Sequence, residues 1–309
     1  ATARRDVGVM AVRSTNRAMD AFRDAIGDAG AVCVRGGGTR WSVGRSGVRD
    51  AVREVAAPVG VEAFEPAEMT VRVGAGTTLE ELAGAIGMHG QEVALDGPAG
   101  ATVGGALMVG RSPLRRGRLG EATDALLQAD CVGADGSAFT AGGPTVKNVT
   151  GYDLCRLLVG SLGTLAALGR VILRTRPVPE ASCWLSGSAE PAAVRLLVHR
   201  PATVLWDGTR TTVRIEGHGA DVRAQADRLR DAGLIEAEPP SLPPWRDRWT
   251  GSLPPGAVLE CGAGVIHRGE PGPAPIIPAG VAVLAARMRD AFDPDRRLNP
   301  GCDPNRVSA

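Results

Sequence analysis

The segment Ala31-Val32-Cys33-Val34-Arg35-Gly36-Gly37-Gly38-Thr39 is a short apolar run that passes directly into three consecutive glycines. The apolar run predicts a buried β-strand, and glycine lets the backbone that follows adopt conformations that larger residues avoid. Successive N–H groups in such a loop can point at one anion without interference from side chains. The segment therefore predicts a strand and a loop suited to a diphosphate, although an ordinary turn has the same pattern.

Two further stretches offer bare backbone and hydroxyl groups, and together with the first they could enclose one extended ligand. They are Thr102-Val103-Gly104-Gly105, and Gly151-Tyr152-Asp153 followed by Gly160-Ser161-Leu162-Gly163-Thr164-Leu165. Neither the G-x-G-x-x-G dinucleotide pattern nor the Walker pattern G-x-x-x-x-G-K-[ST] occurs. A dinucleotide-binding fold with the G-x-G-x-x-G pattern and an ATP-hydrolysing enzyme are therefore both without their main support.

The composition excludes several classes of protein. The 309 residues exceed the usual size of one core, so two domains are expected. The 35 basic and 34 acidic residues are interleaved along the chain, which argues against nucleic acid as a partner. No apolar run reaches the roughly 18 residues that span a bilayer, and the segment from Ala1 to Asp6 lacks the apolar core of a signal peptide. We expect a cytoplasmic protein with no transmembrane segment.

The cysteines and the rare residue types are also informative. The six cysteines include no C-x-x-C pair, so we expect no metal site, and any iron–sulfur centre must belong to a partner chain. Lys147 is the only lysine and Tyr152 the only tyrosine, and they lie five residues apart. Either residue fits a role at a bound cofactor, and a solvated surface position fits Lys147 equally well.

The expected elements alternate between helix and strand. Thr78 and Glu81 have the spacing of a capping box for a helix over 79–87, and Asp153 is expected to cap the helix that follows it. Residues 100–120 are expected to form a long functional loop. Pro177 and Pro179 predict a domain boundary. Beyond it we expect an α+β domain with a proline-rich stretch at 239–255, then a C-terminal helix from about residue 282.

Two segments resemble one flavoprotein family almost residue for residue. They are Lys147-Asn148-Val149-Thr150-Gly151-Tyr152-Asp153-Leu154 and the segment from Gly160 to Leu165. This family is the vanillyl-alcohol oxidase/p-cresol methylhydroxylase (PCMH-type) family, and within it the FAD-binding subunits of glycolate oxidases. Four further segments are similar to the wider family. They are Thr102-Val103-Gly104-Gly105, Arg118-Leu119-Gly120, Asp124 and the terminal Leu298-Asn299-Pro300-Gly301.

The resemblance implies FAD as the cofactor. It implies that Gly36, Gly37, Gly38 and Thr39 wrap the pyrophosphate, with Thr102, Gly104 and Gly105 on its other side. Gly163 and Thr164 would lie by the adenine half and Asn299 near the flavin ring. The full set of cofactor-binding residues so implied is Arg35, Gly36, Gly37, Gly38, Thr39, Pro98, Thr102, Gly104, Gly105, Arg118, Gly120, Asp124, Lys147, Tyr152, Gly163, Thr164 and Asn299.

The implied fold class is α+β, a PCMH-type FAD-binding fold of two α+β subdomains with a reduced α+β cap domain. The FAD-binding domain is expected over 1–178, the cap over 179–280, and a C-terminal segment that returns to the FAD domain over 281–309. Family members with covalent flavin attach it through His, or His and Cys, on these loops. Here the loops carry no His and Cys33 lies inside a strand, so non-covalent FAD is expected.

The implied function is that of the FAD-binding subunit of a glycolate oxidase complex. Such a complex oxidises glycolate, a small 2-hydroxyacid, to glyoxylate and passes electrons to an iron–sulfur subunit. The implied partners are a catalytic flavoprotein subunit and that iron–sulfur subunit, which can hold the chain at the periphery of the inner membrane. Two alternatives stay open: an autonomous D-lactate-type dehydrogenase, and a structural subunit without flavin. No catalytic base is identified from the sequence, and His218 and His267 are weak candidates.

Overall fold

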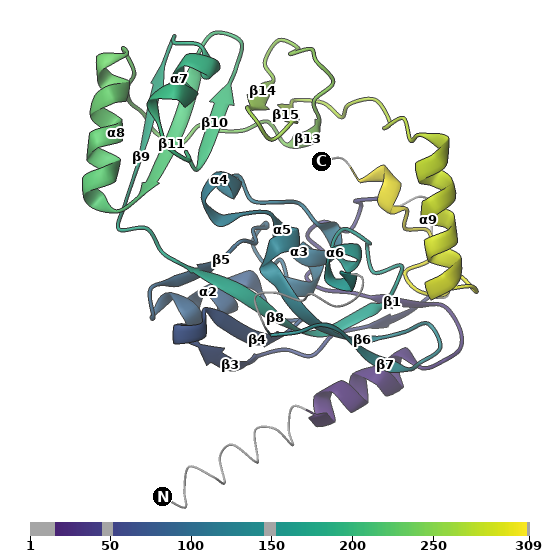
Figure 1. Cartoon of the computed structure of the whole chain (residues 1–309). Helices are drawn as coiled ribbons and strands as arrows, with labels where there is room; N and C mark the ends of the chain where they lie inside the picture. The colour runs from purple at the N-terminus through teal and green to yellow at the C-terminus, as the bar shows by residue number, and fades with distance from the viewer. Residues whose placement is uncertain (1–15, 45–51, 145–152, 308–309) are drawn as a thin grey trace, which may run out of the picture. The chain divides into compact units, whose positions relative to one another are not determined.

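The computed structural model describes residues 16–44, 52–144 and 153–307, and these form two compact units (Figure 1). The first unit comprises the described residues up to Ser112, Glu121–Arg176 and Ile276–Val307. The second comprises Pro113–Gly120 and Pro177–Pro275. The chain therefore changes unit between Arg176 and Pro177 and again between Pro275 and Ile276. The assignment of segment 113–120 to the second unit was not anticipated from the sequence.

The first unit is built on a six-stranded sheet of order β3-β4-β8-β6-β7, with β5 paired to β8. Its longest strand, β8, lies between β4 and β6, and both pairings are antiparallel. The side chains of β8 alternate little in burial, because both faces of this central strand are covered. The strands are β3 (Val61–Glu65), β4 (Thr70–Gly74), β5 (Gln91–Val93), β6 (Leu126–Val132), β7 (Ala138–Gly142) and β8 (Ala167–Pro177).

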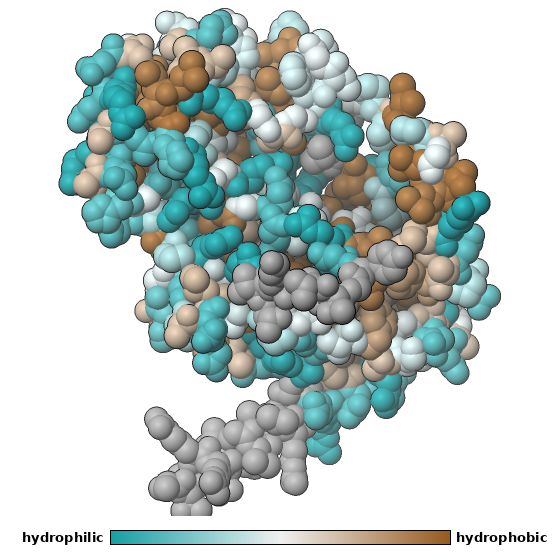
Figure 2. Space-filling view, viewed as in Figure 1, coloured by the Kyte–Doolittle hydropathy of each residue, from teal (hydrophilic) through white to brown (hydrophobic). Residues whose placement is uncertain are grey.

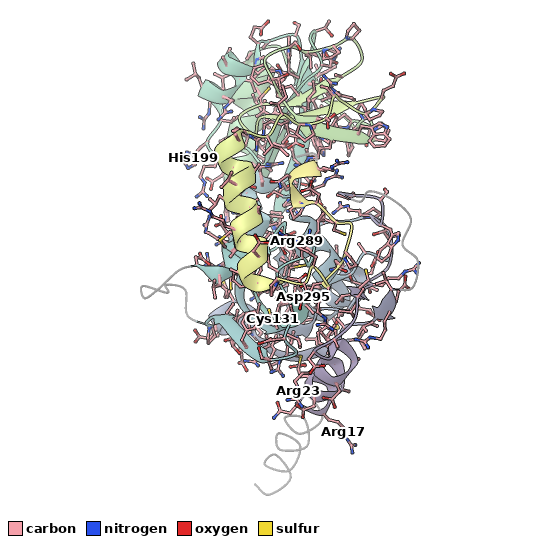
Figure 3. The ribbon with its side chains drawn as sticks, turned by 90° about the vertical axis from the view of Figure 1, so that its right-hand side faces the viewer. Arg17, Arg23, Cys131, His199, Arg289 and Asp295 are labelled. Atoms are coloured by element: carbon pink, nitrogen blue, oxygen red, sulfur yellow. The ribbon has the colours of Figure 1, made fainter. Side chains whose placement is uncertain are left out.

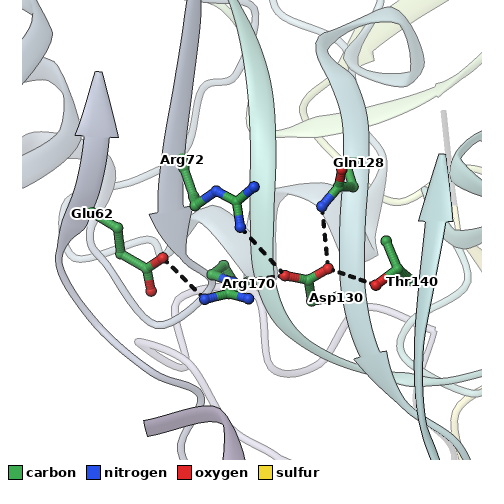
Figure 4. A network of polar contacts seen from close by, with 6 residues as sticks. All are labelled: Glu62, Arg72, Gln128, Asp130, Thr140 and Arg170. Atoms are coloured by element: carbon green, nitrogen blue, oxygen red, sulfur yellow. Dashed lines mark hydrogen bonds and ion pairs between the residues drawn. The ribbon is translucent and has the colours of Figure 1, made fainter. Parts of the chain in front are cut away.

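A network of charged side chains crosses this sheet from β3 to β7 (Figure 4). Asp130 on β6 accepts from Arg170 on β8 at 2.6 Å and lies 3.9 Å from Arg72 on β4. Arg170 also reaches Glu62 on β3 at 3.3 Å, and Thr140 on β7 donates to Asp130 at 2.9 Å. Burial raises the pKa of Glu62, although the nearby Arg170 opposes this shift. The network thus joins five strands through partly buried side chains and the exposed Thr140.

A separate pair of parallel strands carries the glycine-rich segment. Strand β1 (Val32–Val34) pairs with β2 (Arg53–Val55), and Leu298 from the C-terminal tail forms a bridge on Val32. The buried guanidinium of Arg297 fixes this tail, because it donates to five backbone carbonyls between residues 26 and 134. The C-terminal residues therefore lie directly beside the strand that opens the chain's first glycine loop.

The helices of the first unit cover its sheet and include the predicted caps. The capping box of Thr78 and Glu81 is confirmed, since the Thr78 side chain accepts from Glu81 N at 3.2 Å and Glu81 accepts from Thr78 N at 3.0 Å. Asp153 also caps its helix as predicted. The helices are residues 16–26, α2 (Leu79–Gly87), α3 (Val103–Val109), α5 (Ala122–Ala125), α6 (Leu154–Leu158), α9 (Ala279–Phe292) and the 3₁₀ turns η1 (Pro66–Glu68) and η2 (Pro304–Arg306).

The expectation of a continuous loop over 100–120 was wrong, because helix α3 begins at Val103 and α4 (Arg116–Leu119) follows in the second unit. Gly104 and Gly105 are poor helix formers, which concealed α3 in the sequence. Tertiary packing overrides this weak propensity, since Val103 and Leu107 are fully buried in the core.

The second unit is a seven-stranded sheet of order β12-β9-β11-β10-β14-β15-β13 with helices α7 and α8 packed on it. Its core contains Leu185, Val213 and Leu229. Arg115 reaches the buried Glu216 in a bidentate pair at 2.6 Å, and Arg116 reaches the buried Glu260 at 3.0 Å. The elements are β9 (Ala181–Gly187), α7 (Pro191–Leu197), β10 (Thr203–Trp206), β11 (Thr211–Gly217), α8 (Gly219–Asp231), β12 (Ile235–Glu236), β13 (Trp245–Arg248), β14 (Val258–Glu260) and β15 (Val265–Arg268).

Among the described α-helices, α9 is the one with no buried residue. Val281, Val283 and Leu284 are at least half exposed, and hydrophobic side chains gather over this helix in the space-filling view (Figure 2). Among the helices that the structure describes, none has the length and apolar character needed to cross a membrane.

Candidate functional site

The candidate site is a cavity in the first unit, formed where the glycine loop after β1 meets the N-terminus of α3 and the turn at 162–163. Its volume is about 120 Å³, and the space up to its open mouth brings this to about 900 Å³. The lining residues are Val34, Arg35, Gly36, Gly37, Gly38, Thr39, Arg40, Trp41, Val43, Ala57, Ala75, Gly76, Ala101, Thr102, Gly104, Gly105, Ala106, Met108, Val109, Leu162, Gly163, Ala166, Ala167, Leu168, Asn299 and Cys302.

The glycine loop, residues 36–40, presents backbone amides to the cavity. Within the described parts of the chain, the N–H groups of these five residues donate no hydrogen bond, whereas Arg35 N just before them donates to Val55 O at 2.9 Å. A run of amides without protein acceptors is costly unless water or a ligand accepts from them. The loop therefore has the donors that a diphosphate requires.

The glycines of this loop also allow it to pack closely on the neighbouring loop. A Cβ at Gly36 would overlap the hydroxyl of Thr102, and one at Gly37 would overlap the carbonyl oxygen of Gly100. Gly38 has a positive φ of 72°, which favours glycine for a different reason. Two of the three glycines are therefore required by loop-to-loop contact and the third by backbone conformation.

The N-terminus of α3 also faces the cavity, but its amides are already used. Val103 N donates to Thr77 O at 2.9 Å, and Gly104 N donates to Ala75 O at 2.7 Å. Gly105 N donates to the Thr102 hydroxyl oxygen at 3.2 Å, so Thr102 acts as the helix cap. Thr102, Gly104 and Gly105 thus provide surface and a hydroxyl group, not free backbone N–H groups.

Two arginines line the cavity, and each is paired with a carboxylate that is not part of the lining. Arg35 pairs with Glu54 at 2.8 Å and lies over the Trp41 ring at 5.0 Å. Arg40 donates to the Asp96 carbonyl at 3.4 Å and lies 3.7 Å from the Asp96 carboxylate, and its side chain is 19% exposed. The lining contains no Asp, Glu or His among the residues that the structure describes. An anionic group is therefore favoured here, and a general base is not provided by this lining.

The turn at 162–163 closes the opposite side of the cavity. Leu162 and Gly163 both have positive φ, at 53° and 67°. The Gly163 N–H donates to the Ser161 hydroxyl oxygen at 3.3 Å. The carbonyl oxygens of Leu162 and Gly163 each accept from Asn299 Nδ2 at 3.0 Å. Leu162 also packs with Val109 and Cys302 in a small apolar cluster. This side of the cavity is thus apolar and internally hydrogen-bonded.

The structure separates the predicted site residues into several groups. Those gathered at the cavity are Arg35, Gly36, Gly37, Gly38, Thr39, Thr102, Gly104, Gly105, Gly163 and Asn299. Pro98 instead accepts a turn hydrogen bond from Ala101, Asp124 pairs with Arg156, and Thr164 donates to Ser161 O and faces a second cavity beside α9. Arg118 and Gly120 belong to the second unit. Lys147 and Tyr152 lie outside the described residues.

Among the lining residues that were not predicted from the sequence, three have charged, aromatic or thiol side chains. Arg40 follows the glycine loop directly, and a cation in that position is a signal that could have been used. Trp41 is one of few aromatic residues in the chain. Cys302 is remote in sequence, and it reaches the cavity only because the C-terminal tail pairs with β1.

The geometry agrees with comparisons to known proteins. Residues 8–142 match the model of a family described as an FAD binding domain. The chain is 30% identical to the glycolate oxidase subunit GlcE of Escherichia coli (strain K12) over 68% of this chain and 63% of that protein. It is 35% identical to the D-lactate dehydrogenase of Archaeoglobus fulgidus over 47% of this chain and 33% of that protein. The chain thus spans less than two thirds of the length of these relatives.

A solved structure of alkyldihydroxyacetonephosphate synthase superposes with a TM-score of 0.57 and 15% identity, over 73% of this chain and 54% of that chain. At this identity the similarity concerns the fold alone. The donor set also fits the cofactor of the matched family, because the unused amides of residues 36–40 and the cation of Arg40 suit the pyrophosphate of FAD.

Proposed function

Since this chain carries an FAD-binding domain of the PCMH type, we propose that it is the FAD-carrying subunit of a complex that oxidises a small 2-hydroxyacid such as glycolate. Electrons would leave through an iron–sulfur subunit, and a second flavoprotein subunit would perform most of the substrate chemistry. The similarity to a glycolate oxidase subunit supports this proposal.

The observation that carries the proposal is the run of five backbone amides at 36–40 that face this cavity and have no acceptor among the described residues. The glycine loop would hold the pyrophosphate and Arg40 would balance part of its charge. The apolar side formed by Val109 and Leu162 suits an aromatic ring and excludes water from it. FAD, when bound, supplies a two-electron acceptor, and the protein's part is to orient and cover it.

The division of labour between subunits follows from what the cavity lacks. Oxidation of a hydroxyl-bearing carbon requires a group that accepts the hydroxyl proton. No carboxylate or imidazole lines the cavity among the described residues. We therefore place the substrate chemistry mainly on a partner subunit and electron handling on this chain.

The first experiment is an absorbance spectrum of the purified chain, followed by acid precipitation. Flavin bands in the native protein, with the colour released into the supernatant, are expected for non-covalent FAD. A correctly folded but colourless protein would remove the proposal and leave the structural subunit without flavin. Colour that stays in the pellet would indicate covalent attachment, for which Cys302 at the cavity is the residue to test.

The second experiment adds glycolate anaerobically to this chain alone and to its complex with the other two subunits. Flavin bleaching in the complex, with little in the isolated chain, is the expected result. Rapid bleaching of the isolated chain would instead favour an autonomous dehydrogenase.

His267, a weak candidate for a catalytic base, is 8% exposed in the second unit. Its Nε2 lies 2.7 Å from the buried carboxylate of Glu260, which Arg116 and Arg246 also approach. This arrangement is that of a buried polar network within the second unit, so we assign it no part in the proposed reaction.

The exposed apolar face of α9 is the surface that we assign to a partner subunit. Ile276 and Leu284 are 97% and 61% exposed, and a contiguous apolar patch of this kind marks interaction sites. Val283→Asp with Leu284→Asp should reduce co-purification of the other subunits while leaving the flavin spectrum intact. The control is Leu196→Asp with Val59→Asp, since these are exposed apolar residues outside α9.

A further inference from the structure

Asn299 occupies a junction between three segments that are far apart in sequence. It is only 5% exposed, and its backbone has a positive φ of 40°. Its N–H donates to Val32 O at 2.9 Å, and its carbonyl accepts from Cys302 N at 3.1 Å. The backbone of Asn299 is therefore held by β1 on one side and by the C-terminal turn on the other.

The side-chain amide of Asn299 joins the two walls of the cavity. Its Oδ1 accepts from Val34 N at 3.1 Å, two residues before the glycine loop begins. Its Nδ2 donates to Leu162 O and to Gly163 O, each at 3.0 Å. An amide nitrogen has two N–H groups, and both are used here. Asn299 thus has no remaining N–H donor for a cofactor.

The backbone around these hydrogen bonds is strained. Leu162, Gly163 and Asn299 all have positive φ, and for a non-glycine residue this conformation costs about 1–2 kcal/mol. A Cβ at Gly163 would overlap Asn299 Nδ2, so the close approach also requires a glycine. Such strain persists only where surrounding contacts hold it, and it concentrates at functional sites.

We propose that Asn299 is a positioning residue, which locks the turn at 162–163 to β1 and so fixes the glycine loop for the pyrophosphate of FAD. It acts through Val34 and the turn, and it does not contact the flavin ring. The role concerns cofactor binding only, so it holds whether or not the chain takes part in 2-hydroxyacid oxidation.

The test compares FAD with ADP, which has the pyrophosphate but lacks the flavin ring. Asn299→Gly keeps a residue that tolerates positive φ and removes all three side-chain hydrogen bonds. Affinities are measured by titration of the deflavinated full chain, well below its unfolding temperature. We expect both FAD and ADP to bind about tenfold more weakly, or worse, because the glycine loop is common to both ligands.

Two matched variants keep the result interpretable. Arg296→Gly changes another positive-φ residue of the same tail, which is exposed and pairs with Asp290. This variant should leave both affinities unchanged. Asn299→Asp retains the acceptor for Val34 N and loses both donors, so it should weaken FAD and ADP binding even if Asn299→Gly does not fold.

The outcomes separate positioning from direct contact. If FAD binds more weakly while ADP binding is unchanged, Asn299 contacts the flavin half and the proposal is overturned. It is likewise overturned if Asn299→Asp and Asn299→Gly leave both affinities unchanged. A parallel loss for the two ligands, with a normal circular dichroism spectrum, supports the positioning role.

Discussion

The glycine loop at 36–40 and the N-terminus of α3 at 103–106 lie on the same cavity and share a glycine-rich sequence, yet their amides are used differently. The amides of the glycine loop have no acceptor among the described residues, whereas those of α3 donate to Thr77, Ala75 and Thr102. Glycine in the loop leaves donors available, while glycine in α3 permits a close helix approach to residue 75. Glycine content alone therefore does not identify the anion-binding surface.

The largest effect is expected from Gly37→Ala, because the new Cβ would overlap the carbonyl oxygen of Gly100. Overpacking against backbone should destabilise the first unit by about 3 kcal/mol and abolish FAD binding. Urea unfolding and flavin titration measure the two effects. Gly84→Ala on α2, where a Cβ meets open space, is the matched control and should be neutral or stabilising.

A smaller effect, confined to binding, is expected from Arg40→Gln. The change removes a cation at the end of the glycine loop and should weaken FAD binding about tenfold, since hydrogen bonds to charged groups contribute about 1.5–3 kcal/mol. The binding should also become less sensitive to salt. Arg23→Gln, on the helix over 16–26 (labelled in Figure 3), is the control. Equal affinity in both variants would show that Arg40 does not face the pyrophosphate.

Thr102→Ala tests the N-terminus of α3. Loss of the α3 cap should reduce the free energy of unfolding by about 1 kcal/mol, as Thr78→Ala should at the cap of α2. Because the α3 amides are already used within the protein, FAD affinity should change far less than in Arg40→Gln. A larger loss of affinity in Thr102→Ala than in Arg40→Gln would show that the N-terminus of α3, and not the glycine loop, dominates binding of the pyrophosphate.

The smallest effect is expected from Gly38→Asn. The residue has a φ of 72°, which asparagine tolerates, and a Cβ there meets nothing closer than Arg35 at 3.8 Å. The free energy of unfolding should change by less than about 0.5 kcal/mol. The amide of residue 38 stays in place, so FAD affinity should be retained. A strong loss in equilibrium titration would mean that the ligand fills the space beside this Cα.

Much of the local structure could be predicted from the sequence. The capping box at Thr78 and Glu81 and the cap at Asp153 depend on residues close together in the chain. That the loop at 36–39 and the stretch at 102–105 could enclose one ligand was expected from their glycine and hydroxyl residues, whereas the place of Asn299 was expected only through the family resemblance. Helix α3 was missed, because its glycines oppose the helix and only its buried side chains reveal it.

The sequence by itself determined three features: the strand followed by a glycine loop, the membership of the FAD-binding family, and the helices with local caps. These features depend on residues that are neighbours in the chain. Only the tertiary structure decided which amides remain available, since an N–H of α3 finds its acceptor about 25 residues away. It also decided that Asn299 is a buried link between β1 and the turn at 162–163. Hydrogen-bond partners of that kind are set by packing, which no local pattern contains.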